Sequence, residues 1–255
     1  MTAAERERVI WHDVECGAYA ADLPLWRDLA AAAEGPVLDV GAGSGRVALD
    51  LAARGHEVVA LDLDAALLAA LRERAGGLPV AAAQADMRAF QLGRHFALIL
   101  VPMQTVQLLG SPAERAEFLG CARRHAAPGG LLAMALADPF EGMSPHDGPD
   151  ELPVPDLREV AGVVYASQPI AVREVAGGTE IERIRQRVGA DGSVVRAPDV
   201  VRVTALAPAT LEAEAAAAGF SPRPRHAIAP TPDHVGSTVV VAQAPSAGAA
   251  TVAAP

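Results

Sequence analysis

The chain is poor in several residue types, and each shortage narrows the class of protein. Aromatic residues make up 4% of its 255 residues, and lysine is absent, so arginine supplies the permanent positive charges. The net charge of −10 opposes binding to the phosphate backbone of a nucleic acid. A polybasic membrane-binding cluster is also missing. We therefore expect a small-molecule substrate, with neither nucleic acid nor membrane as a partner, and a monomer or homodimer.

Cysteine is scarce too, and its placement argues against a metal site. Cys16 and Cys121 lie far apart, and neither belongs to a CxxC pair or a His/Cys cluster. Residues 1–8 are charged and lack the apolar centre of a signal peptide. No apolar run reaches membrane-spanning length. These features favour a cytoplasmic protein with free thiols and no metal.

What is abundant is hydrophobic sequence, at 51% of the residues, enough for the core of one large domain. We assign that domain to residues 9–244. Residues 1–8 are expected to be flexible. Residues 245–255 contain only small residues, proline, threonine and valine, and are expected to be disordered.

Strand-like and helix-like segments alternate in the first half of the domain. Short apolar runs predict buried parallel strands, and segments with helical periodicity follow most of them. The strands are expected at 36–40, 57–61, 78–84, 96–101 and 131–137, and the helices at 44–54, 64–74 and 112–126. Such alternation predicts an α/β fold with a doubly wound parallel sheet.

The pattern changes after Asp138. A loop rich in proline, glycine and acidic residues is followed by β-like runs near 158–176, 179–190 and 193–206, separated by Gly177-Gly178 and Asp191-Gly192. These runs predict a three-stranded antiparallel insertion over about 158–206. A helix at 208–218 and strands near 220–228 and 236–243 are expected to complete the domain.

The segment Val37-Leu-Asp-Val-Gly-Ala-Gly-Ser-Gly-Arg46 is the strongest functional signal. A strand that enters a glycine-rich turn and then a helix is typical of a ligand-binding turn. Glycines allow the tight bend and a close approach of a ligand, and the helix N-terminus presents N–H groups to a carboxylate or phosphate. We therefore place a ligand at Gly41, Ala42, Gly43 and Gly45.

Two ligands compete for this turn. A dinucleotide fingerprint, GxGxxG, needs a third glycine at position 46, where this chain has arginine. Asp39 would lie poorly beside a pyrophosphate but well beside an ammonium group. S-adenosylmethionine (SAM) carries an ammonium, a carboxylate, a ribose and a sulfonium, so it suits the turn better than NAD.

Further polar residues follow the next two strands. Asp62 ends the second strand and could accept hydrogen bonds from ribose hydroxyls, although NAD enzymes share this feature. Leu63 could cover an adenine face, and Asp86, after the third strand, could accept from the adenine amine. Asp62 could instead be a helix cap and Asp86 a turn residue. The ordered set, each at a strand end, favours a nucleoside site.

These residues give the chain a clear resemblance to class I SAM-dependent methyltransferases. The resemblance covers about residues 36–138 and is carried by VLDVGAGSGRVALDLAARGHEVVALDLD (37–64), AQADMRAF (83–90), FALILVP (96–102) and RRHAAPGGLLAMAL (123–136). It implies a seven-stranded, mostly parallel sheet whose last strand is antiparallel. The insertion resembles, in architecture alone, those of small-molecule N-methyltransferases.

The resemblance also implies roles for individual residues. Asp39, Gly41, Ala42 and Gly43 would contact the methionine part of SAM. Asp62 and Leu63 would contact ribose and adenine, Asp86 and Met87 the adenine, and the main chain of Val101 would lie beside the donor.

The acceptor is expected beyond the carboxyl ends of the strands. Three segments should meet there: residues 11–19, residues 102–107 and the insertion. The second is not the Asn-Pro-Pro-Tyr type found in DNA adenine and protein glutamine methyltransferases. Met103, Gln104 and Gln107 are the acceptor-binding candidates, although the glutamines could equally face solvent.

A base is needed only if the acceptor must lose a proton. His12 is the first candidate and Tyr19 the second, with an exposed histidine on a mobile lid as the alternative for His12. Asp13 and Glu15 could hold a cationic amine or be surface charges. Ile181, Arg183, Arg185 and Arg187 share one face of a strand, which could bind an acidic group but is more typical of a solvated edge.

The sequence thus predicts SAM-dependent methyl transfer to nitrogen or oxygen of a small molecule. Two alternatives stay open: a SAM-binding protein with another reaction, such as a cyclisation, and a non-catalytic nucleoside-binding module with a plugged cavity. An NAD oxidoreductase is a more distant fourth.

Overall fold

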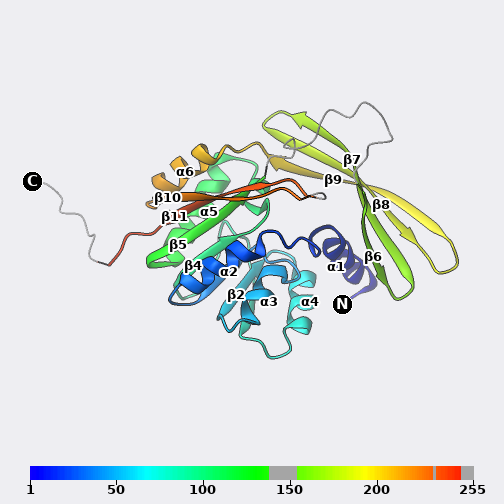
Figure 1. The fold of residues 1–255 in the computed structure, drawn as a ribbon, viewed down its shortest axis with the longest axis horizontal. Helices are drawn as coiled ribbons and strands as arrows, with labels where there is room; N and C mark the ends of the chain where they lie inside the picture. The colour runs from blue at the N-terminus through cyan, green and yellow to red at the C-terminus, as the bar shows by residue number, and fades with distance from the viewer. Residues whose placement is uncertain (138–153, 232–233, 248–255) are drawn as a thin grey trace, which may run out of the picture.

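The computed structural model describes residues 1–137, 154–231 and 234–247, and two β-sheets dominate it (Figure 1). The first sheet has seven strands in the order β10-β11-β5-β4-β1-β2-β3. Its strands are β1 (Val37–Val40), β2 (Val58–Asp62), β3 (Val80–Gln84), β4 (Phe96–Val101), β5 (Ala126–Leu136), β10 (Ser221–Ile228) and β11 (Ser237–Gln243). β11 is antiparallel to both of its neighbours, whereas β1 to β5 pair in parallel. The doubly wound, mostly parallel sheet is confirmed.

Helices cover both faces of this sheet because its strands are apolar on both sides. One apolar core packs the sheet against α2 (Leu23–Ala32), α3 (Arg46–Ala52) and α4 (Ala65–Ala75). The other packs it against α5 (Pro112–His125) and α6 (Pro208–Ala217). A short 3₁₀ helix, η1 (Thr105–Leu108), follows β4. None of the helices in these described ranges is long and apolar enough to cross a membrane.

The insertion has four strands, not the three expected. They run in the order β6 (Asp156–Val160), β7 (Val163–Val175), β8 (Gly178–Val188) and β9 (Val194–Thr204), all antiparallel. The extra strand arises because the run at 158–176 folds back at Ala161-Gly162, where both residues have positive φ. Tight hairpins need this conformation, but Asn or Asp usually precedes the glycine, so the turn was not predicted.

The N-terminal segment is helical, which corrects the expectation of a flexible stretch at residues 1–8. Helix α1 spans Ala3–Cys16 and begins with a capping box, in which Thr2 and Glu5 bond to one another's backbone N–H groups. Val9 anchors the helix in a small apolar cluster with α4. In Figure 1 α1 lies between the seven-stranded domain and the inserted sheet.

The start of β5 differs from the expected limit, and the expected C-terminal boundary of the domain stays untested. β5 starts at Ala126, five residues before the predicted strand at 131–137, and its pairing with β4 has a register shift between Phe96 and Leu98. The expected disorder of 245–255 lies mostly outside the described residues, which end at 247, and the domain limits 9–244 stay a prediction.

Candidate active site

The glycine turn joins β1 to α3 and is bonded to the end of β2. The N–H groups of Gly41 and Ala42 donate to the carbonyl of Leu61 at 2.8 and 3.0 Å, and Gly43 N–H donates to Asp62 Oδ2 at 2.8 Å. Asp62 Oδ1 accepts from Asp64 N–H at 2.8 Å. Each oxygen of Asp62 keeps one lone pair, so this carboxylate can still accept bonds from a ligand hydroxyl.

The glycines of this turn are needed because other side chains lie directly against them. Gly43 has φ +55°, and a Cβ there would lie 2.3 Å from Nε2 of His12 in α1. A Cβ at Gly41 would lie 2.4 Å from Cγ2 of Thr105 in η1. Helix α1 and the segment after β4 therefore pack directly against the turn.

Asp39 is the most unusual residue of the site. Its side chain lines the cavity beside the turn, and the residue is only 1% exposed. Neither carboxyl oxygen has a hydrogen-bond partner among the described residues. Burial raises the pKa of Asp39 to about 7, although the nearby charge of Arg46 opposes the rise. A buried carboxyl group without a partner is costly unless a cation meets it, so the site suits an ammonium group.

Arg46, which takes the place of the third dinucleotide glycine, has a structural role. Its guanidinium binds Asp22 through both nitrogens at 2.5 and 2.7 Å and donates to the carbonyl of Tyr19 at 2.9 Å. Its positive charge remains close enough to Asp39 to act on it.

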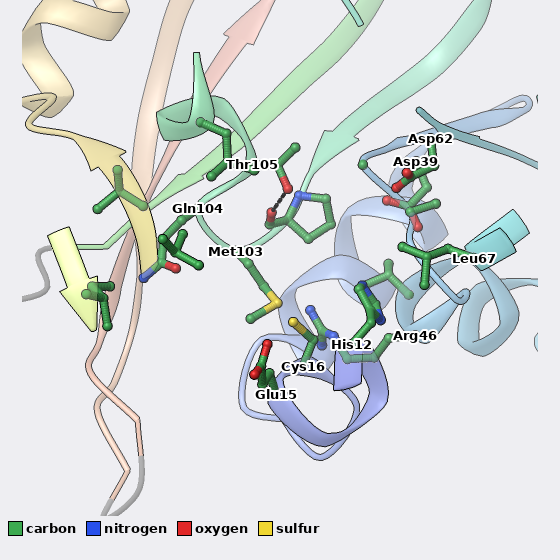
Figure 2. Close-up of a pocket in the computed structure, with 18 of the residues that line it drawn as sticks. His12, Glu15, Cys16, Asp39, Arg46, Asp62, Leu67, Met103, Gln104 and Thr105 are labelled. Carbon is green, nitrogen blue, oxygen red and sulfur yellow. Dashed lines mark hydrogen bonds between the residues drawn. The ribbon is translucent and has the colours of Figure 1, made fainter. Parts of the chain in front are cut away.

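A cavity of about 370 Å³ extends from this turn toward the inserted sheet (Figure 2). Asp39 and Asp62 lie at one end, α1 contributes a second wall, and the segment after β4 contributes a third. Of the residues assigned from sequence to the cofactor, to the base or to acceptor binding after β4, the structure brings seven to this cavity: His12, Asp39, Gly41, Ala42, Asp62, Met103 and Gln104. The Gln104 amide has no hydrogen-bond partner among the described side chains and backbone and is therefore available to a ligand.

Other predicted residues do not line the cavity. They are Tyr19, Gly43, Gly45, Leu63, Asp86, Met87, Val101 and Gln107. Val101 is fully buried, Leu63 is 67% exposed, and Asp86 forms a two-pronged ion pair with Arg88. This pairing lowers the pKa of Asp86. The adenine contacts of Leu63, Asp86 and Met87 stay predictions.

The acceptor-binding assignment of Gln107 is corrected. Its side chain is buried and bonds to both the N–H and the carbonyl of Ala137, at 2.9 and 3.0 Å, and to the carbonyl of Thr204 at 3.1 Å. Ala137 follows β5 and Thr204 ends β9, so Gln107 ties the 3₁₀ helix to the two points where the insertion leaves and rejoins the core. Both amide N–H donors of Gln107 are therefore used within the protein, and the side chain does not line the cavity.

The assignment of Tyr19 as a base is corrected as well. Its ring packs edge-on against His234, with centroids 4.9 Å apart, and under the guanidinium of Arg46. Burial raises the pKa of its hydroxyl, which further disfavours the phenolate form. Tyr19 supports Arg46 and does not reach the cavity.

The acidic residues of α1 are not free to hold an amine. Asp13 accepts hydrogen bonds from Ser44 at 2.6 Å and from Arg74 at 2.5 Å, and it forms an ion pair with Arg158 at 2.9 Å. Burial alone would raise the pKa of Asp13, but hydrogen bonds from His12, Arg74 and Ser44 hold it well below its usual range. Both oxygens of Glu15 are bound by Arg185, at 2.7 and 2.8 Å.

The arginine face of β8 is not a solvated edge. β8 lies inside its sheet, and the face packs on α1, where Arg185 binds Glu15 and Arg187 reaches Glu7 at 3.4 Å. Ile181 and Arg183 line the cavity. The three segments expected to meet at the acceptor site all contribute to the cavity, and Cys16, Thr105, Val201 and Val203 are lining residues from them that the sequence analysis did not single out. The lining residues outside these segments that it missed are Val47, Leu67 and Leu108. The period-two pattern of β9 could have shown that Val201 and Val203 share a face.

Comparisons with known proteins show that this chain is similar to methyltransferases. The family described as a methyltransferase domain matches residues 37–130. A search of curated proteins finds no match.

Solved structures of methyltransferases resemble nearly the whole chain. A SAM-bound amino pentose methyltransferase from Micromonospora echinaspora is 26% identical, covers 95% of this chain and 97% of its own, and has a TM-score of 0.64. A sugar N-methyltransferase from a Streptoalloteichus species is 23% identical over 94% and 93%, with a TM-score of 0.71. A glycopeptide N-methyltransferase complexed with S-adenosylhomocysteine is 25% identical over 89% of both chains, with a TM-score of 0.60. Residues 37–130 therefore match a methyltransferase domain, and with its glycine turn and its sheet order the chain has the class I fold of SAM-dependent methyltransferases.

Proposed function

We propose that this chain transfers the methyl group of SAM to a nitrogen or oxygen atom of a small-molecule acceptor. The observation that carries the proposal is a single cavity with the cofactor turn at one end and the segment after β4 and the inserted sheet at the other. A volume of about 370 Å³ is in the range of small-molecule sites.

The residues at the turn fit SAM. Asp39 would hold the ammonium group, because its buried oxygens have no hydrogen-bond partner in the part of the chain that the structure describes. Asp62 would accept from the ribose hydroxyls, and the backbone of Gly41 and Ala42 would lie along the methionine part. When bound, SAM supplies an electrophilic methyl group, and the chain's contribution is to orient the acceptor toward it.

The opposite wall would hold the acceptor. Met103, Leu108, Ile181, Val201 and Val203 give it an apolar surface, and Gln104 offers an amide that has no partner in the described ranges. Solved relatives act on amino pentoses, sugars and glycopeptides, which makes amines of these classes the first acceptors to test.

His12 remains the base candidate for acceptors that must lose a proton. Its Nδ1 lies 3.4 Å from Ser44 Oγ and 4.0 Å from Asp13 Oδ1. A proton on Nδ1 would face these acceptors, which leaves Nε2 to take a proton from the substrate.

The remaining parts of the proposal rest on the sequence. An acidic chain without lysine supports a protein that works without nucleic acid. A cytoplasmic location and a monomeric or homodimeric state belong to the proposal as well.

The test is methyl transfer from isotopically labelled SAM to a panel of amino sugars and peptide amines, followed by mass spectrometry. We expect labelled product and S-adenosylhomocysteine in equal amounts. Product formed without label would favour a cyclisation. SAM binding without any product across the panel would count against methyl transfer to this acceptor class.

A further inference from the structure

The turn after β4 holds a backbone conformation that a side chain disfavours. Met103 has φ +56°, and it and Ala161 are the two non-glycine residues with positive φ in the described ranges. This conformation costs about 1–2 kcal/mol for a residue with a Cβ. Such strain persists only where neighbouring groups enforce it, often at functional sites. Met103 lines the cavity, and its side chain extends toward Cys16 of α1 (Figure 2).

Thr105 is the group that closes this turn. Its hydroxyl donates to the carbonyl of Pro102 at 2.9 Å, and its backbone N–H points at the same oxygen at 3.4 Å. The hydrogen-bonded ring encloses Met103 and Gln104, the two residues that would face the acceptor. Gln104 adds no side-chain bond to the start of η1, so the hydroxyl of Thr105 is the side-chain group that fastens the turn.

The same side chain also contacts the cofactor turn. Its Cγ2 atom lies 2.4 Å from the position that a Cβ on Gly41 would take, and its Oγ1 atom lies 2.9 Å from the same position. The methyl group of Thr105 therefore faces the turn that would hold SAM, while its hydroxyl lies beside that turn and also bonds to the segment that would hold the acceptor.

We propose that Thr105 is a positioning residue that sets the acceptor segment relative to the cofactor turn. Its hydroxyl holds Met103 in the left-handed conformation, and its methyl group fixes the spacing to Gly41. The acceptor part of this inference rests on the proposed function.

Two substitutions separate the two branches. Thr105→Val keeps both γ branches but loses the hydroxyl, so we expect kcat to fall at least tenfold while the Kd for SAM stays within threefold. Thr105→Ser keeps the hydroxyl but loses the methyl group, so we expect kcat within threefold of the wild type and a SAM Kd weakened about three- to tenfold. A residue that only stabilises the fold would not produce this split.

A melting experiment tests the turn without any acceptor. Loss of this one partly buried hydrogen bond should lower Tm by about 2–4 °C in a chain of this size. Thr105→Val should lower Tm by this amount in the native background. In the Met103→Gly background it should lower Tm by less than half of this amount, because glycine adopts the positive φ without a stabilising hydrogen bond.

The outcomes are distinct. Equal Tm losses in both backgrounds, or a Thr105→Val enzyme with native kcat, overturn the role of the hydroxyl. A Thr105→Ser protein with native SAM affinity overturns the role of the methyl group. Failure of the wild type to methylate any acceptor would instead count against the proposed function, and the melting cycle would still decide whether Thr105 holds the turn.

Discussion

At the scale of single residues, the site is built around a carboxyl group that destabilises the free protein. Asp39 is buried, lacks a partner among the described residues, and has a pKa raised to about 7 from 3.8. An acid whose pKa is higher in the folded state stabilises the fold fully below its unfolded pKa. That contribution is lost as the pH rises through the folded pKa. The ammonium group of a bound ligand would stabilise the ionised carboxylate and so restore this stability.

The first prediction follows from this loss of stability with rising pH. The Tm of the wild type without SAM should fall between pH 5 and pH 8 by more than the Tm of Asp39→Asn, because asparagine cannot ionise. At pH 8 the variant should be the more stable protein. Scanning calorimetry over this range checks the difference, and parallel Tm curves for the two proteins would refute the account of Asp39.

The second prediction concerns the approach of α1 to the turn. Gly43→Ala should weaken SAM binding more than tenfold, because the new Cβ would meet His12 at 2.3 Å at a positive φ. Gly55→Ala is the control, since Gly55 also has positive φ, +91°, but nothing lies within 4 Å of its Cβ position. The control should lose about 1 kcal/mol of stability and no SAM affinity. Equal affinities for both variants would contradict the prediction.

Residues at strand ends were predictable, whereas residues whose partners are distant in sequence were not. Asp39 and Asp62 follow from a strand, a glycine turn and the rule that strand ends meet at one edge. Gln107 looked equally suited to a substrate, but its amide is consumed by Ala137 and Thr204, 30 and 97 residues away. No local pattern reports such a pairing.

At the scale of elements, α1 forms one wall of the cavity and joins the two sheets. Asp13 binds it to the core through Ser44 and Arg74, and Glu15 binds it to β8 through Arg185. Burial would raise the pKa of Glu15, but Arg185 and Ser167 hold it below its ordinary value. The helix is therefore fixed from both sides.

The third prediction tests this attachment. Glu15→Gln should reduce the free energy of unfolding by about 2 kcal/mol, because its charged hydrogen bonds are largely buried, with side chains 13% and 26% exposed. Glu182→Gln is the matched control, since its partner Arg173 is 62% exposed. The control should lose about 1 kcal/mol or less. Urea titration compares them, and equal losses would contradict a fixed α1.

Elements with strong periodicity were predicted well, and those with unusual signals were missed. The strand at 96–101 was predicted with the observed limits. Helices α1 and α2 were not predicted, although the Thr2-to-Glu5 capping box was a readable signal for α1. The turn at Ala161-Gly162 was missed because alanine seldom takes a positive φ, so β6 and β7 were read as one run.

At the scale of the whole molecule, the cavity lies between two separately formed sheets. The seven-stranded sheet supplies the cofactor end, and the inserted sheet covers the acceptor end with Ile181 and Val201. This open cavity disagrees with the plugged site that a non-catalytic nucleoside-binding module would require. Ligand binding between the two parts should stabilise the folded molecule as a whole.

The fourth prediction concerns this stabilisation of the folded protein by a bound ligand. SAM at one hundred times its Kd should stabilise the fold by about 2.7 kcal/mol. For a chain of this size the gain corresponds to a Tm higher by about 5–10 °C. NADH at the same concentration should leave Tm unchanged, because the carboxylate of Asp39 repels a pyrophosphate and the turn lacks the third glycine of the dinucleotide fingerprint at position 46. A shift with NADH and none with SAM would reverse the cofactor assignment.

The central claim is that Asp39 and the glycine turn bind SAM, and isothermal titration calorimetry of SAM against the wild type and Asp39→Asn tests it most directly. We expect one binding site in the wild type and affinity at least a hundredfold weaker in the variant, measured near pH 8 where the Asp39 carboxylate is ionised. No binding to the wild type, or equal affinity in the two proteins, would contradict the claim.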